Sequence, residues 1–197
     1  MPDCSDCCIY REYYPTKEFG KIGVLLLPEE KEKIEQLARE KNISIRILPR
    51  IAVGKVKPER VIAYQMMGAM PNGDLCPFLD RKNRSPHGGF ACSIYKDRPL
   101  ACSAYPVIGV DDDKAAAAAI IDQNCQFCKQ QQRQGKKSKR ATGGRASLEG
   151  IEKELESLAR IKSSVQANAG EQVWRYATAT GSDECEAMLL EGWVLER

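Results

Sequence analysis

The chain has 197 residues, 43% of them hydrophobic and 29% charged, with a net charge of +3, an ordinary composition for a globular protein. Its longest apolar runs, IGVLLLP and AAAAAII, are too short for a transmembrane helix, which takes roughly 20 residues. The chain does not open with a basic segment followed by an apolar stretch, so no secretory signal is visible and we expect a cytoplasmic protein that does not enter the membrane.

Residues 19–70 predict one helix among three strands. The strand candidates are GKIGVLLL at 20–27, ISIRILP at 43–49 and RVIAYQM at 60–66. The helix is expected at 28–42, with Pro28 near its first turn and Asn42 as its stop signal.

Residues 71–128 contain many turn signals, such as PNGD and SPHGG, together with five of the cysteines. Within this block AYPVIGV and AAAAAII predict two strands joined by an acidic loop, although the alanine run would also suit a helix. Ser147 is the expected N-cap of the next helix. The elements expected toward the C-terminus are a helix at 147–165, a strand at 171–180 and a short helix at 182–193.

The positive charge is concentrated in residues 129–145, which hold seven Lys or Arg and no acid, whereas the remainder has 23 basic and 27 acidic residues. This stretch lacks apolar periodicity, so we expect a flexible linker at 129–146. It would join a cysteine-rich domain at 1–128 to a C-terminal part at 147–197 that packs on that domain. Alternatively the basic side chains contact nucleic-acid phosphates, although no interleaved aromatic residues offer stacking for bases.

Nine cysteines are an unusual number for an intracellular chain. Cytosolic thiols are kept reduced, so dense cysteine in that compartment favours a metal site over disulfides, and an odd number cannot pair completely. The cysteines stand at positions 4, 7, 8, 76, 92, 102, 125, 128 and 185.

Two Cys-x-x-Cys pairs stand out, Cys4 with Cys7 and Cys125 with Cys128. This spacing lets two thiolates converge on one metal ion while backbone N–H groups point at the sulfurs, as in zinc ribbons and iron–sulfur proteins. A thioredoxin-type redox pair is the alternative, and it needs a preceding strand, which only NCQFCK has. With four further cysteines between them, the two pairs predict a site for a soft metal.

The run CPFLDRKNRSPHGGFACSIYKDRPLACSAYP sets apolar and aromatic residues beside its thiols. Such residues would form a dry wall that controls solvent access to a metal and its reduction potential, or else simply belong to a tight turn between short strands. His87, the one histidine, follows a turn signal and is expected to be exposed. Cys185 is expected to act as a small apolar residue of a helix.

The motifs DCSDCC, CPFL and CSIYKDRPLACSAYP resemble those of the YkgJ-type cysteine-cluster family, which is known for a CxxCxxCC motif. That family is described as a candidate zinc- or iron-chelating domain and includes relatives of the flagellin lysine methylase. The resemblance covers about residues 1–128. Together with the second Cys-x-x-Cys pair, it gives the expected metal ligands: Cys4, Cys7, Cys8, Cys76, Cys92, Cys102, Cys125 and Cys128.

This chain departs from the family pattern at two places. The first family cysteine would fall at position 1, where Met1 stands, so either the natural start lies upstream or Cys128 replaces a lost thiol. Gln126 and Phe127 follow Cys125 where the family usually has a Pro-Gly pair.

Both zinc and iron remain open as the bound metal. The two Cys-x-x-Cys pairs would form a closed tetrahedral zinc site, but they would leave four cysteines over. Iron–sulfur clusters accept irregular spacings such as 76–92–102, and the methylase relatives point the same way. We therefore expect an iron–sulfur cluster, preferably [4Fe–4S], with zinc as the alternative.

The sequence thus predicts an iron–sulfur or iron-binding protein with a redox role and an unidentified redox or protein partner. One alternative is a zinc-stabilised structural or interaction module. Another, on family analogy alone, is an S-adenosylmethionine-dependent protein lysine methylase-like enzyme, whose catalytic residues cannot be named. The expected fold is a small α+β domain of short strands and turns organised by the metal, with flanking helices.

Overall fold

The computed structural model describes part of the chain: residues 6–9, 19–69, 75–85, 89–111, 118–122, 125, 129, 144–178 and 191–196. Helices and antiparallel strands are mixed along it, which confirms the expected α+β class. None of the described helices is long and apolar enough to cross a membrane.

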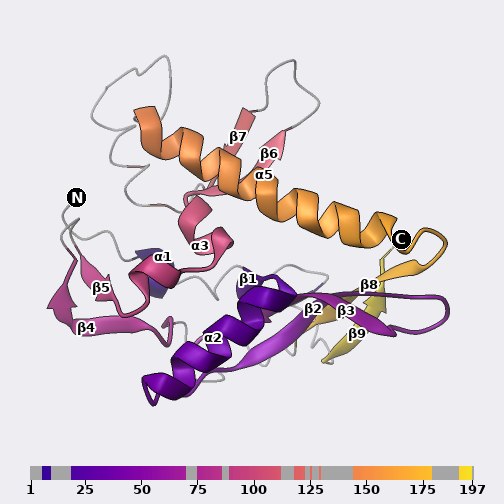
Figure 1. Cartoon of the computed structure of the whole chain (residues 1–197), viewed down its shortest axis with the longest axis horizontal. Helices are drawn as coiled ribbons and strands as arrows, with labels where there is room; N and C mark the ends of the chain where they lie inside the picture. The colour runs from indigo at the N-terminus through magenta and orange to yellow at the C-terminus, as the bar shows by residue number, and fades with distance from the viewer. Residues whose placement is uncertain are drawn as a thin grey trace. The chain divides into compact units, whose positions relative to one another are not determined.

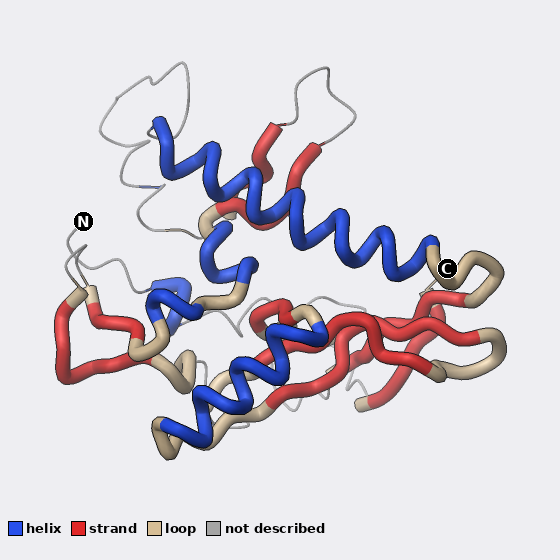
Figure 2. Tube along the Cα trace, viewed as in Figure 1, coloured by secondary structure: helices blue, strands red, loops and turns tan. Residues whose placement is uncertain are grey.

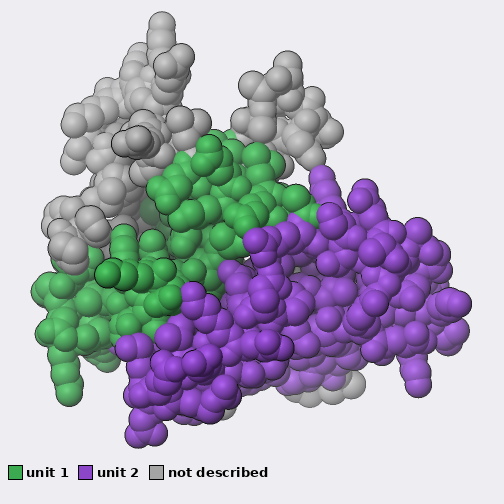
Figure 3. Space-filling view, viewed as in Figure 1, with its two compact units in different colours: residues 1–7, 80–159 green, residues 8–79, 160–197 purple. Residues whose placement is uncertain are grey.

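The chain divides into two compact units, which Figure 3 shows in different colours. Unit 1 comprises residues 1–7 and 80–159, and unit 2 comprises residues 8–79 and 160–197. This division does not test the domain limits expected at 128 and 146, which stay a prediction.

Unit 2 is built on a five-stranded sheet in the order β1-β3-β2-β8-β9, with every neighbouring pair antiparallel (Figures 1 and 2). Its strands are β1 (Val24–Leu26), β2 (Ile47–Gly54), β3 (Arg60–Met66), β8 (Gln172–Ala177) and β9 (Gly192–Leu195). Because β2 pairs with β8, from Ile51 opposite Arg175 to Gly54 opposite Gln172, segments from both parts of the chain share one sheet.

Helix α2 (Pro28–Glu40) contacts β1 and β3 and buries Ile34 and Ala38. The start of the helix is fixed by the carboxylate of Glu30, which accepts a hydrogen bond from the backbone N–H of Leu27 at 2.9 Å. Its stop is the expected one, since Asn42 takes the left-handed conformation with φ of 53°. The larger side chains buried with Ile34 in unit 2 are Leu26, Val53 and Phe78.

Unit 1 combines two hairpins with several helices. One hairpin joins β4 (Leu79–Arg84) to β5 (Phe90–Cys92), and the other joins β6 (Val107–Asp111) to β7 (Ala118–Ile121). The helices are α1 (Asp6–Ile9), the 3-10 helix η2 (Tyr95–Asp97), α3 (Leu100–Ala104) and α5 (Gly144–Gln166). The unit boundaries fall between Cys7 and Cys8 in α1, at the start of β4, and between residues 159 and 160 in α5.

Helix α5 approaches the end of α3 closely inside unit 1. A Cβ atom added at Gly150 would lie 2.8 Å from the carbonyl oxygen of Ala104 and 3.3 Å from the side chain of Val107. Glycine at this position therefore lets the two backbones meet.

Three expectations about element limits are wrong. The strand expected at 43–49 begins at Ile47 and continues to Gly54, because its pairing with β3 passes through register shifts after Pro49. Helix α5 begins at Gly144, three residues before the expected start, so Ser147 is not its N-cap. Gly192 and Trp193 open strand β9 and do not end a helix.

Other expectations are confirmed or fall outside the described residues. The end of the alanine run, Ala118–Ile121, is a strand and not a helix. Apart from Lys129 and residues 144–146, the expected linker lies outside the described residues, and so do residues 182–190 of the expected short helix.

Candidate metal centre

The structure describes six of the nine cysteines. Cys7 and Cys8 lie on α1, Cys92 ends β5 and Cys102 lies in α3. Cys76 precedes β4, and Cys125 follows β7. None of these six forms a disulfide. The remaining candidates lie outside the described residues: Cys4, Cys128, Cys185 and His87.

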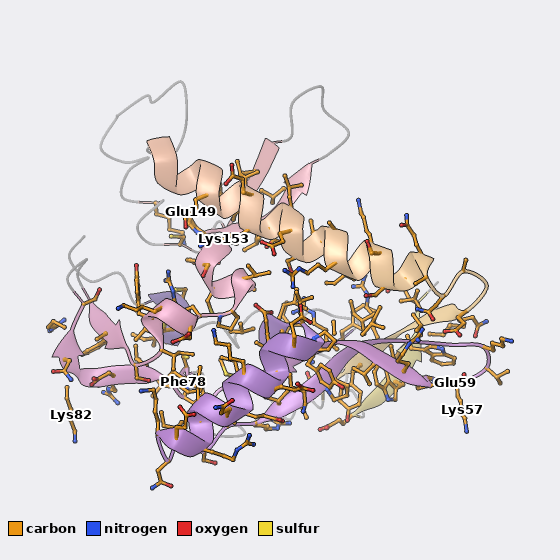
Figure 4. The ribbon with its side chains drawn as sticks, in the orientation of Figure 1. Lys57, Glu59, Phe78, Lys82, Glu149 and Lys153 are labelled. Atoms are coloured by element: carbon orange, nitrogen blue, oxygen red, sulfur yellow. The ribbon has the colours of Figure 1, made fainter. Side chains whose placement is uncertain are left out.

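Two of the expected ligands belong to unit 2, where they lie on adjoining segments. The backbone N–H of Cys76 donates to the carbonyl oxygen of Cys8 at 2.6 Å, and the N–H of Leu79 donates to that of Cys76 at 3.0 Å. Phe78, which lies between Cys76 and Leu79 in the sequence and is labelled in Figure 4, is 1% exposed. The CPFL motif thus anchors its aromatic side chain in the core of unit 2, beside a cysteine that is half-buried.

The other four described cysteines belong to unit 1: Cys7, Cys92, Cys102 and Cys125. Cys125 is 6% exposed, and the other three are half-buried. Cys102, the last residue of the CSIYKDRPLAC motif, lies in helix α3. This end of the motif is therefore a helix and not a turn between two strands.

The pKa of the Cys92 thiol is raised above its usual value. Burial raises its pKa, whereas a hydrogen bond from the backbone N–H of Ile94 and the positive charge of Arg98 lower the pKa. The negative charge of Cys7 raises it again. Arg98 is held in place because its Nε donates to the carbonyl oxygen of Tyr95 at 3.0 Å and its guanidinium lies 3.9 Å from the Tyr95 ring centroid.

A second group of contacts surrounds Tyr105, immediately after α3. Its hydroxyl donates to Oδ2 of Asp122 at 3.0 Å. Burial raises the pKa of Tyr105 far above its usual value, and the negative charges of Cys125, Asp122 and Cys7 raise it further. The backbone N–H of Cys125 in turn donates to the carbonyl oxygen of Asp122 at 3.1 Å.

These electrostatic effects on pKa indicate that three cysteines of unit 1 lie near one another. Cys7 affects the pKa of both Cys92 and Tyr105, and Cys125 affects that of Tyr105. Cys102 stands three residues before Tyr105 in the chain. Among the residues that the structure describes, no three Cys, His, Asp or Glu side chains are grouped closely enough to hold one metal ion.

Sequence reasoning found the cysteines but not the carboxylate beside them. Asp122 is 6% exposed, and its role is visible only once β7 brings it to Tyr105. The available signal was a single acid at the end of an apolar run, three residues before Cys125. Tyr105 itself was expected only as part of an apolar wall.

The donor chemistry fits zinc or iron. Thiolate sulfurs are preferred ligands for both zinc and iron–sulfur clusters, and at Cys92 the N–H of Ile94 and the charge of Arg98 partly offset the rise in pKa that burial causes. A cysteine-rich domain that chelates a soft metal is the class of protein defined by these features.

Comparison with known proteins assigns the chain within that class. Residues 1–129 match the CxxCxxCC family, described as "Putative zinc- or iron-chelating domain", and the chain belongs to this family. No curated protein and no solved structure matches it.

Proposed function

We propose that Cys7, Cys92, Cys102 and Cys125 hold one metal centre in unit 1, and that this centre is a [4Fe–4S] cluster. The observation that carries the proposal is the hydrogen bond from Tyr105 to Asp122, which joins the segments that bear Cys102 and Cys125; in agreement with it, the charge of Cys7 raises the pKa of both Cys92 and Tyr105, and that of Cys125 raises the pKa of Tyr105. Residues about a hundred positions apart in the sequence thereby share one neighbourhood, and binding a metal would draw their sulfurs together.

Iron–sulfur binding is favoured over zinc by the irregular positions of these four thiols. Cys7 and Cys125 each belong to a Cys-x-x-Cys pair, but Cys92 and Cys102 are isolated, and clusters readily take isolated cysteines from separate segments. The N–H group of Ile94 directed at Cys92 and the charge of Arg98 would help to stabilise an anionic centre. When bound, such a cluster supplies one-electron transfer.

The second candidate is a zinc-stabilised structural module, which the family description supports by naming zinc beside iron. Four thiolates from unit 1 would complete a tetrahedral site and leave no open position for chemistry. For the other expected ligands, Cys4, Cys8, Cys76 and Cys128, a role in the same or another site remains a prediction.

Anaerobic purification of the full chain, with visible absorption and analysis of iron, sulfide and zinc, tests the proposal. We expect a coloured protein with about four iron atoms per chain. A colourless protein that holds one equivalent of zinc would contradict the cluster and support the structural module.

Single substitutions identify the ligands. Cys92→Ser and Cys102→Ser should each lose most of the bound metal, because a missing thiolate opens the site. Cys185→Ser is the matched control, since Cys185 is the one cysteine not expected to bind metal, and it should retain wild-type metal content. Retention of metal in both ligand variants would show that the assignment of Cys92 and Cys102 is wrong.

Methylase activity, cytoplasmic location, a redox partner and nucleic-acid contact through residues 129–145 all remain predictions from the sequence. Calorimetry with S-adenosylmethionine addresses the first of them. Absence of binding by the metal-loaded chain would remove the main reason to consider a methylase.

A further inference from the structure

The hydrogen bond between Tyr105 and Asp122 joins the two cysteine-bearing segments on either side of the β6–β7 hairpin. Tyr105 follows Cys102 by three residues, and Asp122 precedes Cys125 by three. The phenol of Tyr105 donates to Oδ2 of Asp122 at 3.0 Å, so one side-chain contact spans the base of the hairpin.

Backbone hydrogen bonds continue the same connection on both sides of this contact. The N–H of Asp122 donates to the carbonyl oxygen of Pro106 at 3.0 Å, next to the pair of Val107 and Ile121 in the hairpin. The N–H of Cys125 donates to the carbonyl oxygen of Asp122 at 3.1 Å. These two hydrogen bonds connect the paired strands of the hairpin, through Asp122, to the backbone of Cys125.

From this arrangement we propose that Tyr105 and Asp122 are positioning residues, a clamp that fixes the separation of Cys102 and Cys125 for metal binding. The inference rests on the metal centre proposed in unit 1. Neither side chain has to touch the metal, because each acts through the cysteine three residues away.

Burial explains why this contact should matter more than an ordinary surface hydrogen bond. Asp122 is 6% exposed, and a hydrogen bond to a buried carboxylate contributes more than one to a carboxylate that water already solvates. Removal of the Tyr105 hydroxyl would delete the side-chain link between the segments that bear Cys102 and Cys125. Loss of the Tyr105–Asp122 hydrogen bond would therefore change the geometry of the cysteine site.

Unit 2 contains a matched contact away from the proposed ligands. Tyr176, which pairs with Trp193 across β8 and β9, donates through its hydroxyl to Oε1 of Glu191 at 2.8 Å, and Glu191 directly precedes β9. Tyr176→Phe therefore removes the same chemical interaction from a unit that holds none of the four proposed ligands.

The test uses the full chain, stripped of metal under reducing conditions and titrated with Co²⁺, whose absorption reports thiolate coordination. Tyr105→Phe should weaken Co²⁺ binding by about 10- to 100-fold, the usual effect of removing a group that orients a metal ligand. Tyr176→Phe should bind as the wild type does.

Two variants of Asp122 separate positioning from general stability. Asp122→Asn keeps an oxygen that can accept from Tyr105 and should bind Co²⁺ close to wild type, whereas Asp122→Ala should weaken binding as Tyr105→Phe does. If Tyr105→Phe does not fold, the comparison between these two variants decides the question.

The possible failures are distinguishable. A wild-type chain that binds neither iron, zinc nor Co²⁺ would overturn the metal centre and the clamp together. A wild-type chain that binds metal, together with Tyr105→Phe and Asp122→Ala variants that bind Co²⁺ as tightly as the wild type, would overturn the clamp alone. Equal weakening by Tyr176→Phe, or no recovery in Asp122→Asn relative to Asp122→Ala, would likewise contradict a positioning role.

Discussion

The phenol of Tyr105 couples the stability of the metal-free protein to alkaline pH. Its pKa is raised in the folded state, first by burial and then by the negative charges of Cys125, Asp122 and Cys7, whereas an unfolded tyrosine ionises near pH 10. The folded state therefore holds this proton more tightly than the unfolded state. The resulting stability is fully present below about pH 10 and is lost as the pH rises above it.

Urea unfolding of the metal-free protein between about pH 8 and 11 checks this expectation. The midpoint of the wild type should fall more steeply above pH 10 than that of Tyr105→Phe, which has no phenol to ionise. Parallel pH dependence in the two proteins would show that Tyr105 is as easily ionised in the folded state as in the unfolded chain.

Gly54, at the end of β2, has no room for a side chain. An added Cβ would lie 1.9 Å from the carbonyl oxygen of Lys57 and 2.9 Å from the backbone nitrogen of Glu59, the two residues labelled on the β2–β3 loop in Figure 4. Gly54→Ala should destabilise the protein by about 1–3 kcal/mol or more, because the loop must move.

A matched substitution at Gly192 controls for the general effect of removing a glycine. Nothing lies within 4 Å of a Cβ added there, so Gly192→Ala should leave the urea midpoint nearly unchanged. Equal midpoints for the Gly54 and Gly192 variants would show that the loop adapts without cost.

At the scale of elements, strand β3 depends on one buried polar side chain. Gln65 is 1% exposed; its Oε1 accepts from the N–H of Gly23 at 3.0 Å and its Nε2 donates to the carbonyl oxygen of Pro49 at 3.3 Å. It therefore links β3 to the segment before β1 and to β2. Gln65→Met keeps the volume but leaves both backbone groups without this partner, at a cost of about 1–3 kcal/mol.

Gln36→Met is the control for that substitution, since Gln36 is exposed on α2 and its amide donates to the carboxylate of Glu40 at 2.8 Å. Its free energy of unfolding should stay within about 0.5 kcal/mol of the wild type. A similar loss from both variants would contradict a special role for the buried amide.

Local patterns predicted those elements whose signals are local. The predicted strand at 60–66 coincides with β3, and α2 was placed by its proline start and asparagine stop. The limits of β2 were missed because long-range pairing with β3 and β8 extends that strand to Gly54. The start of α5 was missed because a plausible capping residue, Ser147, lies inside the helix.

The candidate site shows the same contrast. Spacing and composition identified the cysteines, since thiols in Cys-x-x-Cys pairs signal metal chemistry by themselves. Asp122 carries no such signal, because an isolated acid becomes part of the site only when a hairpin brings it to Tyr105. The strand order could not be predicted either, since no local sequence pattern near β2 indicates that it pairs with β8.

At the scale of the whole molecule, the described residues of unit 1 include fewer buried hydrophobic side chains than those of unit 2. Of the eighteen buried hydrophobic residues among those described, only five belong to unit 1: Ile94, Ala101, Ala104, Val107 and Cys125. Unit 2 buries the other thirteen around its five-stranded sheet. A bound metal would therefore supply a larger share of the stability of unit 1.

Hydrogen exchange of the full chain, with metal bound and after removal by a chelator, tests this difference. Metal present at about a thousand times its dissociation constant would stabilise the folded state by roughly 4 kcal/mol. Its removal should therefore speed exchange mainly in β5, α3 and β6 of unit 1, while amides of β2 and β3 in unit 2 keep their protection because their core remains packed. Equal loss of protection in both units would mean that they unfold as one cooperative structure, and unchanged exchange in unit 1 would mean that its core does not depend on the metal.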